Sequence, residues 1–457
     1  MSSYVVNDKD LKRSLNLNIF AITFGMVFFT VVGNPIGSAI FTGFMRKLGA
    51  GDLVYSIVLA LPVLGAVSQI FGSYLLETTG KRKFMFLSSG LLHRFLWIPV
   101  ALIPLTMKSD SHQVIIWSIT VLITISSVAS SVTSIAFNSW MGTLVPADII
   151  GRFFSKRMLV STISGSASAL IVGLFIDRID NLTGFMIVFV VGSLFGLCDV
   201  STFFFIKHPP MSLPENKTSL LSIIVEPLKN RNYLKFVLFS TVFAFGVNIS
   251  APFYNIYMLE DLKINYFLIY LSNLVMQGIT TILFVRKWGV LADRYGNKPV
   301  TFASGIVLAI VPLMWVFTSP SNLTMVFIAN IFAGIGWSGY NLSTFNQLIW
   351  LAPERNRSAY IASYTLFTSV IGTAAAYICG GIFMQYAQAF FENAHVPFII
   401  GTTLSAFFIL LAVSCLIRFL ALAFFYKLYD EKNAKPVNVM VSDMLLNIKS
   451  RFIDRQA

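Results

Sequence analysis

A charged loop with two glycines occupies residues 289–298 and reads Gly289-Val290-Leu291-Ala292-Asp293-Arg294-Tyr295-Gly296-Asn297-Lys298. Apolar segments flank this loop at about 264–285 and 299–318. Each segment contains the roughly 20 apolar residues that a helix needs to cross a membrane. A charged turn between two such segments is typical of a loop at a membrane surface. This part of the sequence therefore predicts a helical membrane protein.

The composition extends this prediction to the whole chain. Of its 457 residues, 56% are hydrophobic and only 12% are charged, whereas a soluble domain contains about 25% charged residues. So few charged residues cannot cover a water-soluble particle of this size, and much of the surface must therefore face lipid. The three cysteines lie in apolar segments without metal-ligand spacing, and the four histidines are scattered. We therefore expect no metal site and no cofactor.

Twelve apolar segments can be distinguished, separated by charged turns or by turns that contain Gly or Pro. They fall at about 16–45, 53–76, 83–106, 113–140, 157–176, 183–206, 234–259, 264–285, 299–318, 323–350, 358–386 and 397–426. The first of them is too long for the apolar region of a cleavable signal peptide. The sequence thus predicts an all-α integral membrane protein with twelve transmembrane helices.

The basic residues are distributed unevenly among the loops. Twenty-six of the 33 Lys and Arg residues fall in the termini and in the segments on the same side of the membrane, whereas five fall in the opposite loops. Lys and Arg accumulate on the cytoplasmic side of membrane proteins. We therefore expect both termini in the cytoplasm, in a multi-pass protein of the plasma membrane. The same bias explains the net charge of +13 without a nucleic-acid partner.

The two halves of the chain resemble each other at an offset of 217 residues. Pro35 corresponds to Pro252 at this offset, and Gly72 corresponds to Gly289. Two similar halves of six helices indicate a carrier whose site lies between two pseudo-symmetric six-helix bundles. The expected parts are a cytoplasmic N-terminus, a first bundle, a cytoplasmic linker, a second bundle and a cytoplasmic tail, at 1–15, 16–206, 207–233, 234–428 and 429–457.

The loop at 289–298 closely resembles the motif A signature of the major facilitator superfamily, whose pattern is G-x-L-A-D-R-x-G-x-K. The resemblance covers about 15–428 and implies the twelve-helix fold of that family. In the family this loop acts as a latch, so the resemblance implies gating roles for Asp293 and Arg294. We expect Asp293 to cap the next helix and to pair with a neighbouring basic group. Gly289, Gly296 and Lys298 are the other expected gating residues.

The corresponding loop of the first half departs from this signature. It has one extra residue between Gly72 and Gly80, it carries Glu77 in place of the aspartate, and no arginine stands beside the acid. These three residues complete the expected gating set, but the departures put the latch of the first half in doubt. The basic run at 81–83 is interpreted first as an anchor on the cytoplasmic side.

In the fold of this family, the first, fourth, seventh and tenth helices line a central cavity. Amide and aromatic side chains on or beside these helices are the candidates for substrate contacts, namely Asn34, Asn138, Asn248, Tyr254, Asn255, Gln277, Trp337 and Asn341. A buried amide needs hydrogen-bond partners, which a cavity supplies. Amides with aromatic walls suit an uncharged solute such as a sugar. Packing between helices is the competing explanation for small polar residues.

Three charges fall within the expected helices, namely Arg94, Asp199 and Arg418. A charge inside the membrane costs several kcal/mol unless it is paired or hydrated. The depths of Arg94 and Asp199 differ by about 6 Å at a rise of 1.5 Å per residue, so we expect them to form an ion pair. Arg418 has no obvious acidic partner in the sequence. The cavity helices hold no carboxylate at mid-depth, so coupling to H+ or Na+ stays open.

The predicted function is transport of a small solute by a monomeric carrier, either secondary active or facilitative. A multidrug or metabolite exporter of the same fold is the first alternative. The high aromatic content favours an exporter, but the fourth helix lacks the arginine and the fifth lacks the Gly-Pro motif of drug exporters. A lipid-modifying membrane enzyme is the alternative from another class. Such an enzyme would need a pair of carboxylates or a nucleophile with a base, and no such set stands out in the sequence.

Overall fold

The computed structural model describes residues 8–35, 37–106, 112–146, 148–209, 220–353, 357–394, 405–428, 439–440 and 442–443. Its regular elements are helices. Ten helical stretches in this part of the chain are long and apolar enough to cross a membrane. The expected all-helical membrane fold is therefore confirmed for the described residues.

Two of the twelve expected crossings fall outside this set of ten. One is α16 (Thr324–Leu351), a 28-residue helix that carries several polar side chains. The other is divided into α3 (Asp52–Leu64), a 3-10 turn at Gly65–Val67 and α4 (Ser68–Thr79). Pro62 lies inside α3, but the turn that a proline disturbs is the one before it, and this turn is helical here, so Pro62 does not account for the break that begins at Gly65. Twelve crossings therefore stay a prediction.

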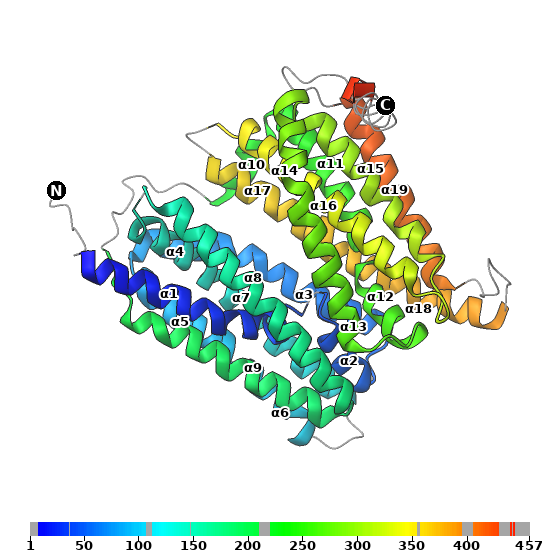
Figure 1. Ribbon diagram of the computed structural model, residues 1–457, viewed down its shortest axis with the longest axis horizontal. Helices are drawn as coiled ribbons and strands as arrows, with labels where there is room; N and C mark the ends of the chain where they lie inside the picture. The colour runs from blue at the N-terminus through cyan, green and yellow to red at the C-terminus, as the bar shows by residue number, and fades with distance from the viewer. Residues whose placement is uncertain are drawn as a thin grey trace, which may run out of the picture. The chain divides into compact units, whose positions relative to one another are not determined.

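The chain forms two compact units, and unit 1 comprises 1–218, 251–271 and 373–385. Its elements from the first half include the helices α1 to α9 (Figure 1). The bounds not yet given are α1 (Asp8–Phe28), α2 (Ala39–Lys47), α5 (Arg82–Phe95), α6 (Trp97–Thr106), α7 (His112–Leu144), α8 (Ile150–Arg178) and α9 (Leu182–Thr202). From the second half it takes α12 (Ala251–Ile256), η5 (Tyr257–Asp261), α13 (Tyr266–Leu271) and the first part of α18 (Ala376–Ala394).

Unit 2 comprises 219–250, 272–372 and 386–457. Besides α16 it contains α10 (Leu220–Leu228), α11 (Arg231–Asn248), η6 (Ser272–Gln277), α14 (Gly278–Tyr295), α15 (Asn297–Trp315), α17 (Arg357–Ser369) and α19 (Ala406–Leu428). Among these, α16 lies beside both α15 and α14, and α19 packs on α11 and α15. The division of the chain into two six-helix bundles at the bounds given above remains a prediction.

The first helix of each sequence half is interrupted near its proline. The apolar segment at 16–45 is divided into α1, a π-helical turn at Phe29–Gly33 and α2, with the break around Asn34 and Pro35. The corresponding segment of the second half is divided into α11 and α12, with Pro252 in the first turn of α12. Proline is tolerated in a first helical turn but breaks a helix interior. The sequence repeat therefore has a structural counterpart.

Three helical segments of the second half change unit at irregular points. The changes fall between 250 and 251, between 271 and 272, and between 372 and 373. The second lies where α13 becomes the π-helix η6, and the third lies inside the π-helix η8 (Val370–Ala375). Since π-helical turns are rare and often mark functional sites, these borders are candidate bending points.

Aromatic side chains form much of the core of each unit. In unit 1, Phe86 lies 4.4 Å from Phe203 and 5.7 Å from Trp140 between ring centroids. In unit 2, the Phe239 and Phe425 rings stack at 4.1 Å. Lipid gives little hydrophobic drive for helix association, so close packing of this kind holds membrane helices together. Core packing thus accounts for part of the aromatic content that had favoured an exporter.

Candidate functional site

The amide and aromatic candidates are divided between the two units and differ in their surroundings. The side-chain nitrogen of Asn248 donates to the carbonyls of Ala244 and Gly372, at 2.8 and 3.2 Å. Asn255 is buried within α12, and Trp337 packs against the aromatic core of unit 2. These contacts place the three predicted residues in helix packing.

Three other candidates have open side chains. Asn34, Asn138 and Asn341 are exposed, and Tyr254 is half-buried. The side chain of Gln277 lies outside the part of the chain that the structure describes. The exposed amides are available to a solute, and their contact with substrate stays a prediction.

The expected pair of charges is present in unit 1. Arg94 on α5 and Asp199 on α9 approach to 2.9 Å between Nη2 and Oδ2, and both side chains are largely buried. Two glycines make room for the pair. A Cβ at Gly25 would lie 2.8 Å from an Asp199 oxygen, and a Cβ at Gly196 would lie 2.5 Å from Cγ of Arg94. The absence of these side chains lets α1, α5 and α9 enclose an ion pair.

Arg418 is held by backbone carbonyls. Its Nη1 donates to the carbonyl of Leu308 at 2.7 Å, and its Nε donates to that of Gly246 at 3.3 Å. The residue is only 5% exposed. It therefore links α19 to α15 and α11, and these carbonyls supply the hydrogen-bond partners that the sequence had not revealed.

Arg157 is the first residue of the apolar segment expected at 157–176, and it was counted among the basic residues on the cytoplasmic side. It lies inside α8 and is only half-exposed. Its Nε donates to Oδ1 of Asn18 at 3.1 Å, and its guanidinium lies 4.6 Å from the centre of the Phe137 ring. Asn18 is itself 1% exposed on α1. The sequence did carry a signal for this helical position: Arg157 is the first residue of an apolar segment, whereas a loop residue would come before the segment.

Residues 289–298, which we continue to call the loop, form a tight turn at Gly296 between the end of α14 and the start of α15 and not the longer loop that the sequence predicted. They make only some of the expected contacts. Gly296 has a φ of 95°, a left-handed value that favours glycine. Asp293 is exposed and makes no hydrogen bond or ion pair with any described residue, and α15 lacks a side-chain cap. The expected capping by Asp293 is therefore wrong for the described chain. A Cβ at Gly289 would meet only Leu342, at 3.8 Å, so packing does not require a glycine there.

A short part of the C-terminal tail packs on this loop within unit 2. Met440 is 0% exposed and lies in a cluster with Trp288, Ala292, Tyr295 and Val300. These residues come from α14 and α15, on both sides of the turn. The tail thus covers an apolar surface that the loop would otherwise expose.

The same tail contact has a polar side. The hydroxyl of Tyr295 donates to Oδ2 of Asp443 at 2.7 Å, and Nη2 of Arg294 lies 3.6 Å from the same oxygen. Arg294 is also close to the Tyr295 ring, at 5.1 Å, and Lys298 lies 5.9 Å from the ring of Tyr426. Arg294, an expected gating residue, is therefore engaged by the tail.

We expect Met440→Asp to release the tail, because the new carboxylate would enter an apolar cluster without a partner. Amide hydrogen exchange at 289–298 should accelerate several-fold, and the melting temperature should fall by a few degrees. Val439→Asp is the matched control, since Val439 is 38% exposed. Equal exchange in the two variants would contradict the docking of Met440.

The first-half loop is fixed differently. Gly80 ends α4 with a φ of 64°, and a Cβ at Gly72 would meet Ile135 at 3.2 Å, whereas Glu77 is exposed.

The basic run at 81–83 is more than an anchor in the membrane surface. Arg82 is 0% exposed and donates to the carbonyl of Ser139, the hydroxyl of Thr143 and the carbonyl of Pro209, at 2.7 to 2.8 Å. It ties the start of α5 to α7 and the linker.

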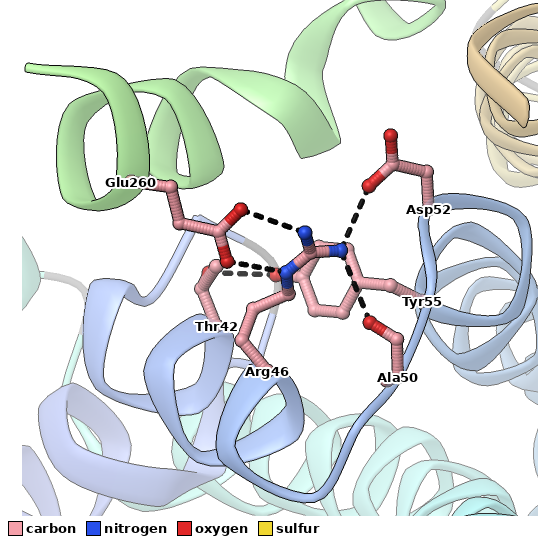
Figure 2. Close-up of polar contacts among 6 residues, drawn as sticks. All are labelled: Thr42, Arg46, Ala50, Asp52, Tyr55 and Glu260. Carbon is pink, nitrogen blue, oxygen red and sulfur yellow. Dashed lines mark hydrogen bonds and ion pairs between the residues drawn. The ribbon is translucent and has the colours of Figure 1, made fainter. Parts of the chain in front are cut away.

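At another place in unit 1, Arg46 joins the two sequence halves. Its Nε and Nη2 donate to both carboxylate oxygens of Glu260 on η5, at 2.6 and 2.7 Å. Its Nη1 donates to Asp52 at 2.8 Å and to the carbonyl of Ala50 at 3.0 Å. Figure 2 shows the guanidinium between the two acids. A bidentate pair of this kind fixes geometry as well as charge.

Further polar contacts surround this ion pair. The hydroxyls of Thr42 and Tyr55 lie 2.7 Å apart, behind the Arg46 guanidinium in the view of Figure 2. On α13, the Tyr270 hydroxyl lies 3.3 Å from that of Ser38. The Asp177 carboxylate accepts the two first backbone N–H groups of α13, at 2.7 and 2.9 Å. Segments of both sequence halves are thus held together within unit 1.

Comparison with protein families gives a match along most of the chain. The model described as Major Facilitator Superfamily matches residues 19–285 and 236–441. No curated protein sequence matches the chain. The family match includes both sequence halves and the loop at 289–298.

Several solved structures have a similar fold. The nucleoside transporter NupG is 16% identical, over 91% of this chain and 99% of that one, with a TM-score of 0.66. A bacterial homologue of the human lysosomal transporter Spinster, inward-facing and occupied, is 13% identical over 92% and 97%, with a TM-score of 0.69. A POT family transporter in complex with 5-aminolevulinic acid is 13% identical over 92% and 97%, with a TM-score of 0.63. At these identities the likeness shows the fold alone.

Proposed function

Because this chain belongs to the Major Facilitator Superfamily, we propose that it carries a small polar solute across the plasma membrane by alternating access. In this mechanism two six-helix bundles rock about a central site and open it to one side at a time. The multi-span fold and its likeness to solved transporters support a carrier rather than an enzyme. The gating roles of the loop at 289–298 are part of the proposal.

The ion pair between Arg46 and Glu260 is the observation that carries this mechanism. Arg46 belongs to the first sequence half and Glu260 to the second, and each lies beyond the break near its proline. An alternating-access carrier needs contacts between its halves that close one side and break when that side opens. We assign this role to the Arg46–Glu260 pair, which we call the outer latch.

Transport can be tested before the solute is identified. The purified full chain is reconstituted into phosphatidylcholine vesicles, which are incubated with a metabolite extract and analysed by mass spectrometry. We expect at least one small polar solute to enter protein-containing vesicles faster than empty ones. If no solute in the extract enters faster, the proposed function is wrong.

Weakening the outer latch should expose the residues behind it. Ser38 is 5% exposed, so a Ser38→Cys probe, with the three native cysteines replaced by serine, should react slowly with an impermeant maleimide in whole cells. Because the Glu260 side chain is 42% exposed, solvent screening limits the pair to about 1 kcal/mol. We expect Arg46→Gln to accelerate labelling about fivefold, the equivalent of that free energy.

The matched control for the latch is the neighbouring basic residue. Lys47 pairs at 3.1 Å with Asp180, whose side chain is 56% exposed, so Lys47→Gln should leave labelling unchanged. Similar acceleration in both variants would show that loss of surface charge, rather than a latch, controls access.

The orientation in the membrane follows from the distribution of basic residues. We propose that both termini lie in the cytoplasm, because 26 of the 33 Lys and Arg residues fall on their side. The Arg46–Glu260 pair then lies on the external side. We also propose a monomer, since one chain supplies both repeats that a complete path requires.

The neutral, sugar-like solute expected from the sequence now rests on fewer residues. Asn138 and Asn341 are open to a solute, but Asn248 and Asn255 are used in packing. We therefore propose a small hydrogen-bonding solute without restricting it to neutral molecules. In α7 and α16, two of the expected cavity helices, the sequence contains no carboxylate. If transport is coupled to a cation, Asp199 is our candidate for the coupling carboxylate.

A further inference from the structure

Arg157 has an environment that fixes the plane of its guanidinium. The group lies 4.6 Å from the centre of the Phe137 ring, and its Nε is bonded to the buried Asn18 at 3.1 Å. An aromatic face attracts a guanidinium, and more strongly where water is excluded. These two contacts position the side chain without using its two terminal nitrogens, which form no hydrogen bond with any described residue.

The charges around Arg157 do not balance. Asp199 is already paired with Arg94 at 2.9 Å, and it is near enough to Arg157 only for a longer-range attraction. Among the described residues, no carboxylate lies within ion-pair distance of Arg157. Two guanidinium groups of unit 1, the half-exposed one of Arg157 and the largely buried one of Arg94, thus share one carboxylate. Since an uncompensated charge is costly in a membrane protein, this site favours an added anion.

The geometry also selects the kind of anion. A guanidinium presents a rigid, planar fork of donors that matches the two oxygens of a carboxylate or of a phosphate. In Arg157 the fork is already oriented by Asn18 and Phe137, so binding an oxyanion would require little further ordering. A halide or a neutral hydroxyl would not match the paired donors of the guanidinium with two oxygen atoms.

We propose that Arg157 binds the carboxylate or phosphate group of the transported solute. This inference rests on the proposed function and adds the class of substrate to it: a small hydrogen-bonding solute with an anionic group. Arg157 is the anchoring residue, and Asn18 and Phe137 are positioning residues. The open amide of Asn138, which lies in the same unit as Arg157, is then available to the neutral part of the solute.

Binding is tested by thermal unfolding of the purified full chain in detergent at constant ionic strength. The probes are inorganic phosphate and two pairs that differ in an anionic group, gluconate with glucose and AMP with adenosine. A metabolite extract, separated on an anion-exchange resin into retained and unretained fractions, widens the range. We expect the anionic probes or the retained fraction to raise the melting temperature of the wild type, and their neutral counterparts to leave it unchanged.

Three variants identify the residue responsible. Arg157→Gln should weaken anion binding at least tenfold. Asn18→Asp should do the same while keeping the protein folded, because it supplies Arg157 with a carboxylate at the position of the present hydrogen bond. Lys156→Gln is the matched control, since Lys156 precedes Arg157 on α8 but is exposed, and it should bind like the wild type.

Several results would overturn the inference. Equal stabilisation by neutral and anionic members of a pair would do so, as would anion binding that survives both Arg157→Gln and Asn18→Asp, or a wild type that no probe stabilises. Phosphatidylglycerol is a further probe in the same assay, and stabilisation by it alone, lost in Arg157→Gln, would assign the site to a lipid headgroup instead of a solute. The vesicle assay distinguishes failure of this inference from failure of the proposed function. If only neutral solutes enter the vesicles, the chain is a transporter but its substrate is not anionic.

Discussion

Asp199→Asn should destabilise the protein by about 3–5 kcal/mol, the cost of leaving a buried charge without its partner. The carboxylate of Asp199 is the only ion-pair partner of Arg94 among the described residues, and both groups are largely enclosed by α1, α5 and α9. Asparagine keeps the shape but removes the charge. The expected result is a large fall in melting temperature in detergent and a low yield of monodisperse protein.

The double variant Arg94→Met/Asp199→Asn separates the charge from the shape. It should recover much of the lost stability, since replacing both members of a buried pair is often close to neutral. Asp180→Asn is the control: its pair with Lys47 is exposed and should contribute less than about 1 kcal/mol. If Asp199→Asn leaves folding and expression intact while Arg94→Leu destroys both, the pair is not what stabilises this region.

Arg82→Ala should have a comparable effect in another part of unit 1. The substitution removes three charge-assisted hydrogen bonds and leaves buried acceptors on Ser139 and Pro209 without a donor. Each unsatisfied acceptor costs about 1–3 kcal/mol, so we expect a total of about 3–5 kcal/mol. Thermal unfolding in detergent measures this loss.

Lys81→Ala is the control for Arg82. Lys81 belongs to the same basic run but is exposed, so its loss should change stability by less than about 0.5 kcal/mol. If the two variants melt at the same temperature, the run acts only as a surface anchor, as the sequence had first suggested.

Hydropathy and charge were sufficient to predict the main features of the fold. The apolar segments gave the helical membrane class, and the signature between Gly289 and Lys298 gave the family, because both depend on local sequence. Pro35 and Pro252, which the 217-residue offset had matched, both lie near an interruption of a helix, although the sequence analysis did not anticipate these breaks. A proline shows where a helix is weakened, but tertiary contacts decide whether it bends or divides.

The contacts of individual charges were harder to predict. Arg94 and Asp199 could be paired because both stood alone in apolar segments at similar depth. Arg418 could not be explained, since its partners are the carbonyls of Leu308 and Gly246, and carbonyls leave no trace in a sequence. Arg46 and Glu260 each follow an apolar segment of the sequence, but 214 residues separate them and only the folded chain brings them together.

The contact between Met440 and the loop at 289–298 has a practical consequence for work with this protein. A fluorescent reporter fused after 428, at the end of α19, would delete the segment that covers Trp288 and Tyr295. The resulting apolar surface would promote association in detergent and lower the apparent quality of an otherwise sound preparation. Reporters and purification tags belong after residue 457, or at the N-terminus. A comparison of the two fusion points in size-exclusion chromatography would reveal the exposed surface directly.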